Sequence, residues 1–143
     1  MTSKSDAYGD IIGKSLIAED ETLDATLGLR FLGATDDTAR GEVPYAPRIS
    51  QRFGVVHGGL YATLAELVAS EGTNHNVWAD GNTGMGSSND TSFLRPINSG
   101  TIHAHARARH RGRTTWVWDV EMTDDEGRLC AVSRVTIAVR PRK

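Results

Sequence analysis

The longest helical pattern of the chain lies in its middle, between residues 54 and 78. Leu60, Leu64, Leu67 and Val68 recur at the spacing of one helix face and form an apolar stripe. The neighbouring face carries one carboxylate, Glu66, among small or hydroxyl-bearing residues: Gly59, Ala62, Thr63, Ser70 and Thr73. The pattern predicts a helix of about five turns that follows a His-Gly-Gly turn.

Six other segments have the character of strands, two before the predicted helix and four after it. They span residues 24–33, 38–45, 83–94, 101–110, 114–123 and 128–139. The turns N-S-G, R-G-R and D-D-E-G separate the last four and are typical of hairpins. The order predicts an α+β fold in which an antiparallel sheet curls around the central helix.

The core of this single domain, residues 1–143, is expected between the helix stripe and one sheet face. The strand residues assigned to it are Val117, Val120, Leu129, Val132, Val135, Ile137 and Val139. Residues 1–8 are polar and are expected to be disordered. Residues 8–18 are expected to form a short helix or turn that packs on the core, and residues 46–54 a loop.

Composition excludes several classes of protein. The 16 basic and 18 acidic residues give a net charge of −2, so no overall field attracts nucleic acid. No apolar run is long enough to span a membrane, and the N-terminus lacks the apolar core of a signal peptide. The one cysteine, Cys130, fits a reducing compartment. We therefore expect a cytoplasmic protein that binds neither membranes nor nucleic acid.

Glu66 and the two glycines at the start of the helix suggest acyl-transfer chemistry. Amide N–H groups that side chains leave uncovered at a helix N-terminus can stabilise an oxyanion, and a carboxylate can attack or activate water. Gly58 and Glu66 are separated by roughly 12 Å along a helix axis. One carbonyl group cannot reach both, so the sequence predicts two antiparallel copies of the helix and an active site between subunits.

Several motifs together resemble those of a known enzyme family. H-G-G precedes Glu66, which lies nine residues after His57, and S-F-L-R-P follows at residues 92–96. This layout resembles the hotdog-fold acyl-CoA thioesterases. T-T-W-V-W-D-V, G-R-L-C-A-V-S and the ending I-A-V-R-P-R are similar to 4-hydroxybenzoyl-CoA thioesterases whose catalytic Glu lies on the central helix.

The resemblance implies a role for each matching residue near the thioester. Glu66 would be the nucleophile or general base, and the Gly58 N–H would bind the carbonyl oxygen. Gln51 and His57 would orient the substrate, while Ser70, where the family has Thr, would assist Glu66 or position water.

The resemblance also implies contacts to the rest of the substrate. Asp24 and Glu71 would contact a ring hydroxyl. The candidates for the coenzyme A nucleotide are Arg95, Arg113, Thr114, Arg140, Arg142 and Lys143. No cofactor or metal is implied, because coenzyme A is part of the substrate, and dimers are expected to pair into tetramers.

Alternatives stay open at this point. The acyl group could be phenylacetyl, dihydroxynaphthoyl or a medium-length chain, or the protein could bind acyl-CoA without catalysis. His57 could only cap the helix. His103 and His105 are expected on a solvated face, Cys130 in the core, and Trp116 and Trp118 at a subunit interface or, less favoured, in an aryl pocket.

Overall fold

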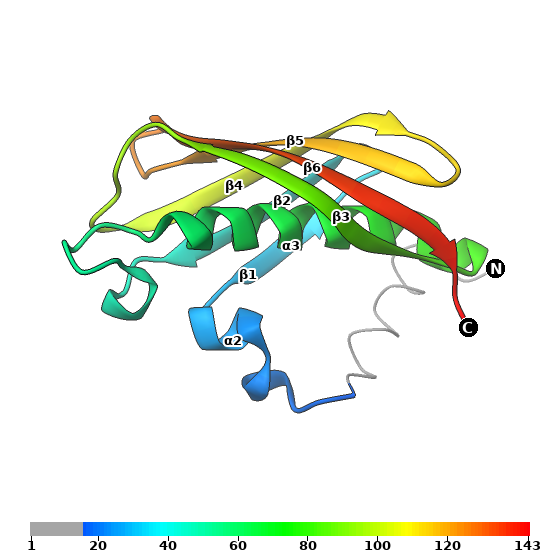
Figure 1. Ribbon diagram of the computed structural model, residues 1–143, viewed down its shortest axis with the longest axis horizontal. Coiled ribbons are helices and arrows are strands. Elements are labelled where there is room, and N and C mark those ends of the chain that lie inside the picture. The colour runs from blue at the N-terminus through cyan, green and yellow to red at the C-terminus, as the bar shows by residue number, and fades with distance from the viewer. Residues whose placement is uncertain (1–15) are drawn as a thin grey trace.

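A computed structural model of the protein describes residues 16–143, and its centre is one long helix partly enclosed by a sheet (Figure 1). The six strands lie in the order β1-β2-β4-β5-β6-β3, and every neighbouring pair is antiparallel. The strands are β1 Arg30–Ala34, β2 Thr38–Pro44, β3 Asn82–Phe93, β4 Thr101–Arg111, β5 Thr115–Thr123 and β6 Leu129–Pro141. The helices are α2 Leu23–Leu27 and α3 Gly58–Val77, with short 3₁₀ turns at Glu19–Glu21, Pro47–Ile49 and Trp78–Asp80. The α+β prediction is confirmed.

Glycines allow α3 to lie close to the sheet. A side-chain carbon at Gly72 would come within 2.9 Å of Ala39 and the Trp118 ring, and one at Gly41 would meet Val68 at 2.6 Å. Leu64 and Val68 of the predicted apolar stripe are fully buried. Because a side chain of one element packs directly on a glycine of the other, the turns of α3 are held at fixed positions along the strands.

The two tryptophans of β5 correct the interface prediction. Trp116 and Trp118 point toward α3, are buried, and stack with 5.9 Å between their ring centroids. Trp118 Nε1 donates a hydrogen bond of 2.9 Å to Thr73 Oγ1 of the helix. Both rings are therefore part of the core of a single subunit.

The segment predicted as the first strand, residues 24–33, begins as a helix instead. The Thr22 hydroxyl accepts a hydrogen bond from the Ala25 N–H and caps α2, and Gly28, with φ of 76°, ends it. Strand β1 starts only at Arg30. The capping threonine outweighs the weak alternation that follows it in the sequence.

Residues 1–8 and most of 8–18 lie outside the described residues. Leu16 and Ile17, which were expected to pack on the core, are exposed. Among residues 16–143, no helix is both long enough and apolar enough to cross a bilayer.

The core prediction is correct for Val120, Val135, Ile137 and Val139, which are buried. Val117 and Val132 are only partly buried and Leu129 is exposed. Residues an odd number apart on one regular strand face opposite sides, so Val117 cannot share a face with Val120. Period-two alternation assigns the inner face of β5 to Trp116, Trp118, Val120 and Met122 instead.

Strand β3 contains a β-bulge at Ser87. Its pairing with β6 shifts register between Gly86 and Ser88, so that one residue has no partner across the ladder. Before the bulge, even-numbered residues, Gly84 and Gly86, face α3. After it, odd-numbered residues do: Asn89 bonds to Ala62 of the helix and Phe93 contacts Gly58. The bulge therefore selects the β3 side chains that reach the helix.

Two buried hydroxyls should respond in opposite ways to removal. Thr73→Val leaves the buried Trp118 N–H unpaired, so we expect a loss of about 1–3 kcal/mol in the free energy of unfolding. The Tyr61 hydroxyl is buried and has no hydrogen-bond partner in the described part of the chain, so Tyr61→Phe should be neutral or slightly stabilising. Urea unfolding of both variants checks this, and equal losses would contradict it.

Candidate active site

The N-terminus of α3 is held open by a histidine cap. His57 Nδ1 accepts a hydrogen bond of 2.9 Å from the Gly59 N–H, and the His57 carbonyl accepts one from the Leu60 N–H. No acceptor among residues 16–143 takes the Gly58 N–H, which is one of the amides that a helix start leaves unpaired. Because Nδ1 accepts, the neutral ring carries its proton on Nε2. The capping role of His57 is thus present, and it leaves an Nε2–H for a further partner.

Gln51 stabilises the loop that precedes this cap. Its side-chain Oε1 accepts a hydrogen bond from the Phe53 N–H, and its backbone carbonyl accepts one from the Gly54 N–H. Gly54 has φ of 83°, and its carbonyl accepts a hydrogen bond from the Tyr45 hydroxyl. The side-chain amide nitrogen of Gln51 keeps its two protons for another acceptor.

Phe93 covers the same helix end and was missed by the sequence analysis. Its ring lies against Gly58, where an added side-chain carbon would be 3.0 Å away, and it tilts against Tyr61 at 6.1 Å between centroids. The ring is nevertheless exposed. The alternation of β3 did not indicate that Phe93 faces the helix, because the bulge at Ser87 exchanges the two faces of the strand.

Glu66 lies two turns along α3 from this end and is exposed. No hydrogen bond or ion pair holds its carboxylate within residues 16–143. It rests against Gly86 of β3, where a side-chain carbon would overlap Glu66 Oε1. Ser70, one turn further along the same side of the helix, is partly buried. Gly58 and Glu66 remain roughly 12 Å apart along the axis, too far for one carbonyl group to touch both.

Asp24 and Glu71 lie on different helices, α2 and α3, and both are partly buried. Burial raises the pKa of the Glu71 carboxyl to about 7 and also raises the pKa of Asp24 above its usual value. No partner for the Glu71 carboxylate exists in the described region. Its charge is therefore unfavourable in the folded protein.

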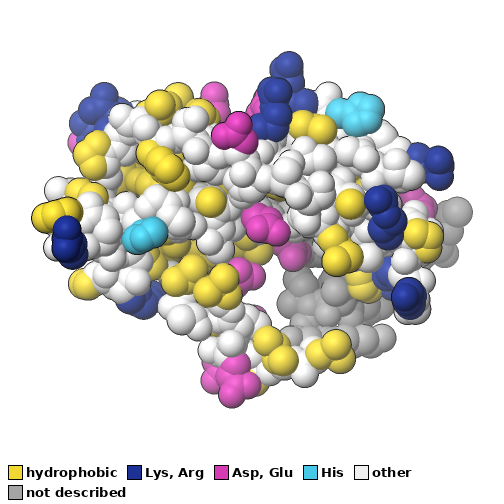
Figure 2. All heavy atoms as spheres, in the orientation of Figure 1, with side chains coloured by type: hydrophobic (Ala, Val, Ile, Leu, Met, Phe, Trp, Pro, Cys, Tyr) yellow, Lys and Arg dark blue, Asp and Glu magenta, His cyan; other side chains and the backbone are white. Residues whose placement is uncertain are grey.

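The six candidate residues for coenzyme A do not converge within one subunit. Arg95 follows the C-terminal end of β3, whereas Arg140 and Arg142 flank the Pro141 that pairs with Asn82 at its start. Twelve residues of strand separate these ends, roughly 40 Å. In Figure 2 the basic side chains lie mainly at the periphery of the face shown, with acidic side chains near its middle.

The remaining coenzyme A candidates gather at the β6 end. The Thr114 carbonyl accepts hydrogen bonds from the Val139 N–H and from Arg140 Nη1. Arg142 stacks on the Trp78 ring at 3.9 Å and donates to the Trp78 carbonyl. Lys143, Arg140 and Arg142 line one hollow, and Arg113 lines a neighbouring one.

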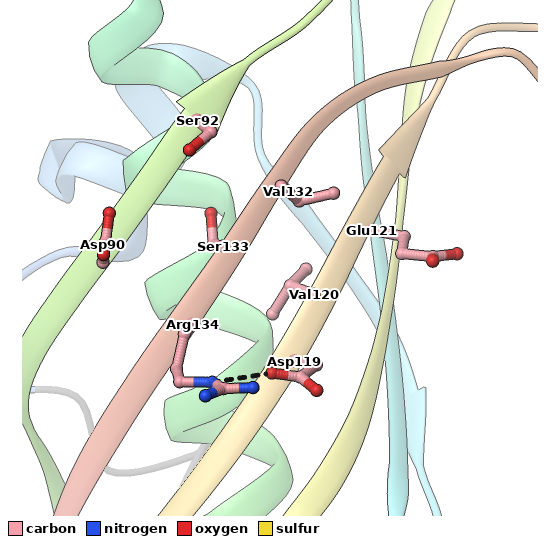
Figure 3. Close-up of a pocket in the computed structure, with 8 residues that line it drawn as sticks. All are labelled: Asp90, Ser92, Asp119, Val120, Glu121, Val132, Ser133 and Arg134. Carbon is pink, nitrogen blue, oxygen red and sulfur yellow. Dashed lines mark hydrogen bonds and ion pairs between the residues drawn. The ribbon is translucent and has the colours of Figure 1, made fainter.

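A shallow depression of about 430 Å³ lies on the outer face of the sheet, away from α3 (Figure 3). It is lined by Asp90, Ser92, Asp119, Val120, Glu121, Val132, Ser133 and Arg134. Arg134 Nε donates to Asp119 Oδ1 at 3.0 Å, so these two charged side chains of the depression already pair with each other. It contains none of the predicted site residues.

The other predicted side chains lie where the sequence analysis put them. Cys130 is fully buried, and His105 is exposed on the outer face. His103 Nε2 bonds to Asp125 Oδ1 at 2.7 Å. Among the described residues, no group of three or more His, Cys, Asp or Glu side chains could hold a metal ion.

Glu71 generates a pH-dependent prediction. Since its folded-state pKa lies above the unfolded value, ionisation between about pH 4.5 and pH 7 destabilises the fold. Glu71→Gln should gain stability relative to wild type as pH rises through this range, on the order of 2 kcal/mol after allowance for solvent screening. Urea unfolding at pH 5 and pH 8 measures the difference, and a difference that stays constant with pH would contradict it.

Comparison with known proteins identifies the family to which the chain belongs. The family model described as Thioesterase superfamily matches residues 53–131, more than half of the chain. The Mycobacterium tuberculosis protein Rv1847, named as an esterase, is 37% identical over 116 residues, which cover 80% of this chain and 83% of that protein.

Solved structures show the same fold. A variant of thioesterase PA1618 from Pseudomonas aeruginosa superposes with a TM-score of 0.82 at 33% identity, covering 87% of this chain and 89% of that one. Thioesterase HI1161 from Haemophilus influenzae gives 0.80 at 30% identity, with coverage of 90% and 93%. The sheet wrapped around one central helix is thus a hotdog fold. The chain belongs to the thioesterase superfamily and is an enzyme that hydrolyses thioesters.

Proposed function

We propose that the protein hydrolyses an aromatic acyl-CoA, with 4-hydroxybenzoyl-CoA as the leading substrate. The observation that carries the proposal is the state of α3: the Gly58 N–H has no acceptor among residues 16–143, and the exposed Glu66 carboxylate has no partner there. These are the two groups that thioester hydrolysis requires. A hydrogen-bond donor stabilises the oxyanion, and a carboxylate supplies or activates the nucleophile.

Two routes use the same groups. In the first, Glu66 attacks the thioester carbon, the C–S bond breaks, coenzyme A leaves as the thiol after protonation, and water hydrolyses the resulting anhydride. In the second, Glu66 takes a proton from a water molecule as its oxygen attacks the thioester carbon, the C–S bond breaks, and the proton passes to the coenzyme A thiolate, which leaves as the thiol. In both routes the carbonyl oxygen becomes negative while it accepts a hydrogen bond from the Gly58 N–H. Ser70 lies one turn from Glu66 and would orient water.

The separation of Gly58 and Glu66 supports a site shared by two subunits. Strand β3 is at the edge of the sheet, so its outer backbone groups are open to a second β3. Antiparallel pairing of two β3 edges would place the Arg95 end of one subunit beside the Arg140 end of the other. The dispersed coenzyme A candidates would then meet. We expect dimers that pair into tetramers. A protein that sediments as a monomer and still has full turnover would contradict the shared site.

Two solved variants of a relative support the roles of Gln51 and Glu66. The Staphylococcus aureus protein SAV0944, 26% identical, has been solved with a glutamate and with a glutamine replaced by alanine, and the two structures have TM-scores of 0.80 and 0.79. Those two positions are 15 residues apart. Gln51 and Glu66 have the same separation.

Asp24 and Glu71 favour a hydroxylated ring over an aliphatic chain. Both carboxyls have raised pKa values because they are partly buried, and a ring hydroxyl would give one of them a hydrogen-bond partner. The second candidate is a thioesterase for phenylacetyl-, dihydroxynaphthoyl- or medium-chain acyl-CoA. Steady-state kcat/KM over this panel distinguishes them. We expect the enzyme in the cytoplasm, as its single cysteine suggests.

Glu66→Gln tests the central assignment. The amide keeps the size of the side chain but is neither a nucleophile nor a base, so we expect kcat to fall by at least about 10²–10³ while aryl-CoA binding persists. Release of free thiol from 4-hydroxybenzoyl-CoA measures turnover. Glu121→Gln, on the outer face, is the control and should keep wild-type activity. Turnover by Glu66→Gln at the wild-type rate would refute the role of Glu66, and no thiol release by the wild type from any acyl-CoA would indicate a binding protein.

Gly86→Ala tests the position of the carboxylate. The added methyl group would overlap Glu66 Oε1, which is the end of a flexible and exposed side chain. The fold should therefore persist while the carboxylate moves, and a shift of about 1 Å can cost about 10²-fold in rate. We expect reduced kcat with an unchanged urea midpoint. If kcat is unchanged, Glu66 does not act from this position.

A further inference from the structure

Two asparagines link α3 to β3, one at the start of the strand and one just after its bulge. Asn74 of the helix accepts hydrogen bonds through Oδ1 from the Gly84 N–H, at 2.7 Å, and from Thr83 Oγ1. Asn89 of the strand donates from Nδ2 to the Ala62 carbonyl at 2.9 Å. The first link lies toward the C-terminal end of α3, and the second lies one turn before Glu66.

The second link is one step in a directed chain of hydrogen bonds. Asn89 Oδ1 accepts a hydrogen bond of 2.7 Å from Thr91 Oγ1. The Thr91 hydroxyl has only one proton, and this bond uses it. The Ser133 hydroxyl, 2.7 Å from Thr91 Oγ1, must therefore be the donor in that contact. The order is Ser133 to Thr91 to Asn89 to the Ala62 carbonyl, and Ser133 is buried on β6. The chain of hydrogen bonds thus starts at a buried side chain on β6, the strand that pairs with β3.

The acceptor at the end of this chain is tied to Glu66. In an α-helix the N–H of residue 66 donates a hydrogen bond to the carbonyl of residue 62. Asn89 therefore donates to the same carbonyl oxygen that accepts the hydrogen bond of the Glu66 N–H. Gly86, on the other side of the bulge, contacts the Glu66 carboxylate. Residues 86–89 of β3 therefore touch the Glu66 turn at its side chain and at its backbone.

We propose that Asn89 is a positioning residue, held by Thr91 and Ser133, that fixes the Glu66 turn of α3 against the bulge of β3. The proposal rests on the proposed function, because it concerns the geometry of Glu66. Asn89 acts only through Glu66 and has no contact with the reacting atoms. Loss of the link lets the helix turn and the strand move relative to each other, and the carboxylate, which has no partner of its own in the described structure, then samples unproductive positions.

The test compares both links in the same assay. Asn89→Ala should lower kcat roughly tenfold to hundredfold with KM changed little, because misplacement affects the chemical step more than binding. Asn74→Ala is the matched control: it removes a helix-to-strand link of the same kind, and it should lower the urea midpoint without lowering kcat. A kcat loss in Asn74→Ala equal to that in Asn89→Ala would mean that the Asn89 link is merely structural.

Thr91 supplies a second pair of variants in case Asn89→Ala does not fold. Thr91→Val removes the hydroxyl that orients Asn89 and should lower kcat, whereas Thr91→Ser keeps the hydroxyl and should restore most of it. Wild-type kcat in Asn89→Ala, or in Thr91→Val if Asn89→Ala does not fold, overturns the proposal. The Glu66→Gln variant separates the two hypotheses. If it keeps the wild-type rate, the catalytic role of Glu66 fails, and if it is inactive while Asn89→Ala is fully active, only the positioning role of Asn89 fails.

Discussion

The close contact between α3 and the inner face of the sheet determines the rest of the structure. Gly72 lets the helix backbone pack directly on Ala39 and the Trp118 ring, and Gly41 lets the Val68 side chain pack directly on the strand. The Trp118–Thr73 hydrogen bond fixes the position of the helix along the strands. At this distance the turns of α3 and the strand residues opposite them form fixed pairs. Glu66 with Gly86, the Ala62 carbonyl with Asn89, and Gly58 with Phe93 are three of these pairs.

The bulge at Ser87 is the second determinant, because it changes which face of β3 meets the helix. Without it, regular alternation would direct Ser88 and Asp90 toward α3 and turn Asn89 and Phe93 to the outer face. Gly86, before the bulge, leaves room for the Glu66 carboxylate. Because of the bulge, Asn89 binds the turn that carries Glu66, and Phe93 covers Gly58. One additional residue thus changes both the carboxylate side and the amide side of the site. Bulges near active sites often redirect side chains in this way.

The electrostatic character of the site follows from partial burial. The helix start leaves the Gly58 N–H unpaired among the described residues and so favours a negative oxygen there, while desolvation makes the charge of Glu71 unfavourable. A substrate with a carbonyl oxygen for the first and a donor for the second would relieve both. Arg95 lies at one end of β3 and the other coenzyme A candidates gather at the opposite end, so they are divided within one subunit. The shared site of the proposed dimer would bring them together.

The sequence by itself determined the elements whose signals are local and strong. The apolar stripe and the His-Gly-Gly start predicted α3, which carries Gly58 and Glu66 on one continuous helix, and alternation and turns predicted the last four strands. Only the tertiary structure decided the outcomes that depend on packing: α2 in place of a strand, the two tryptophans in the core, and the β3 side chains on the helix side. The physical reason is that the alternation of side chains along a strand separates its residues into two faces but does not show which face is buried. A bulge exchanges the faces and leaves no trace in the composition of the strand.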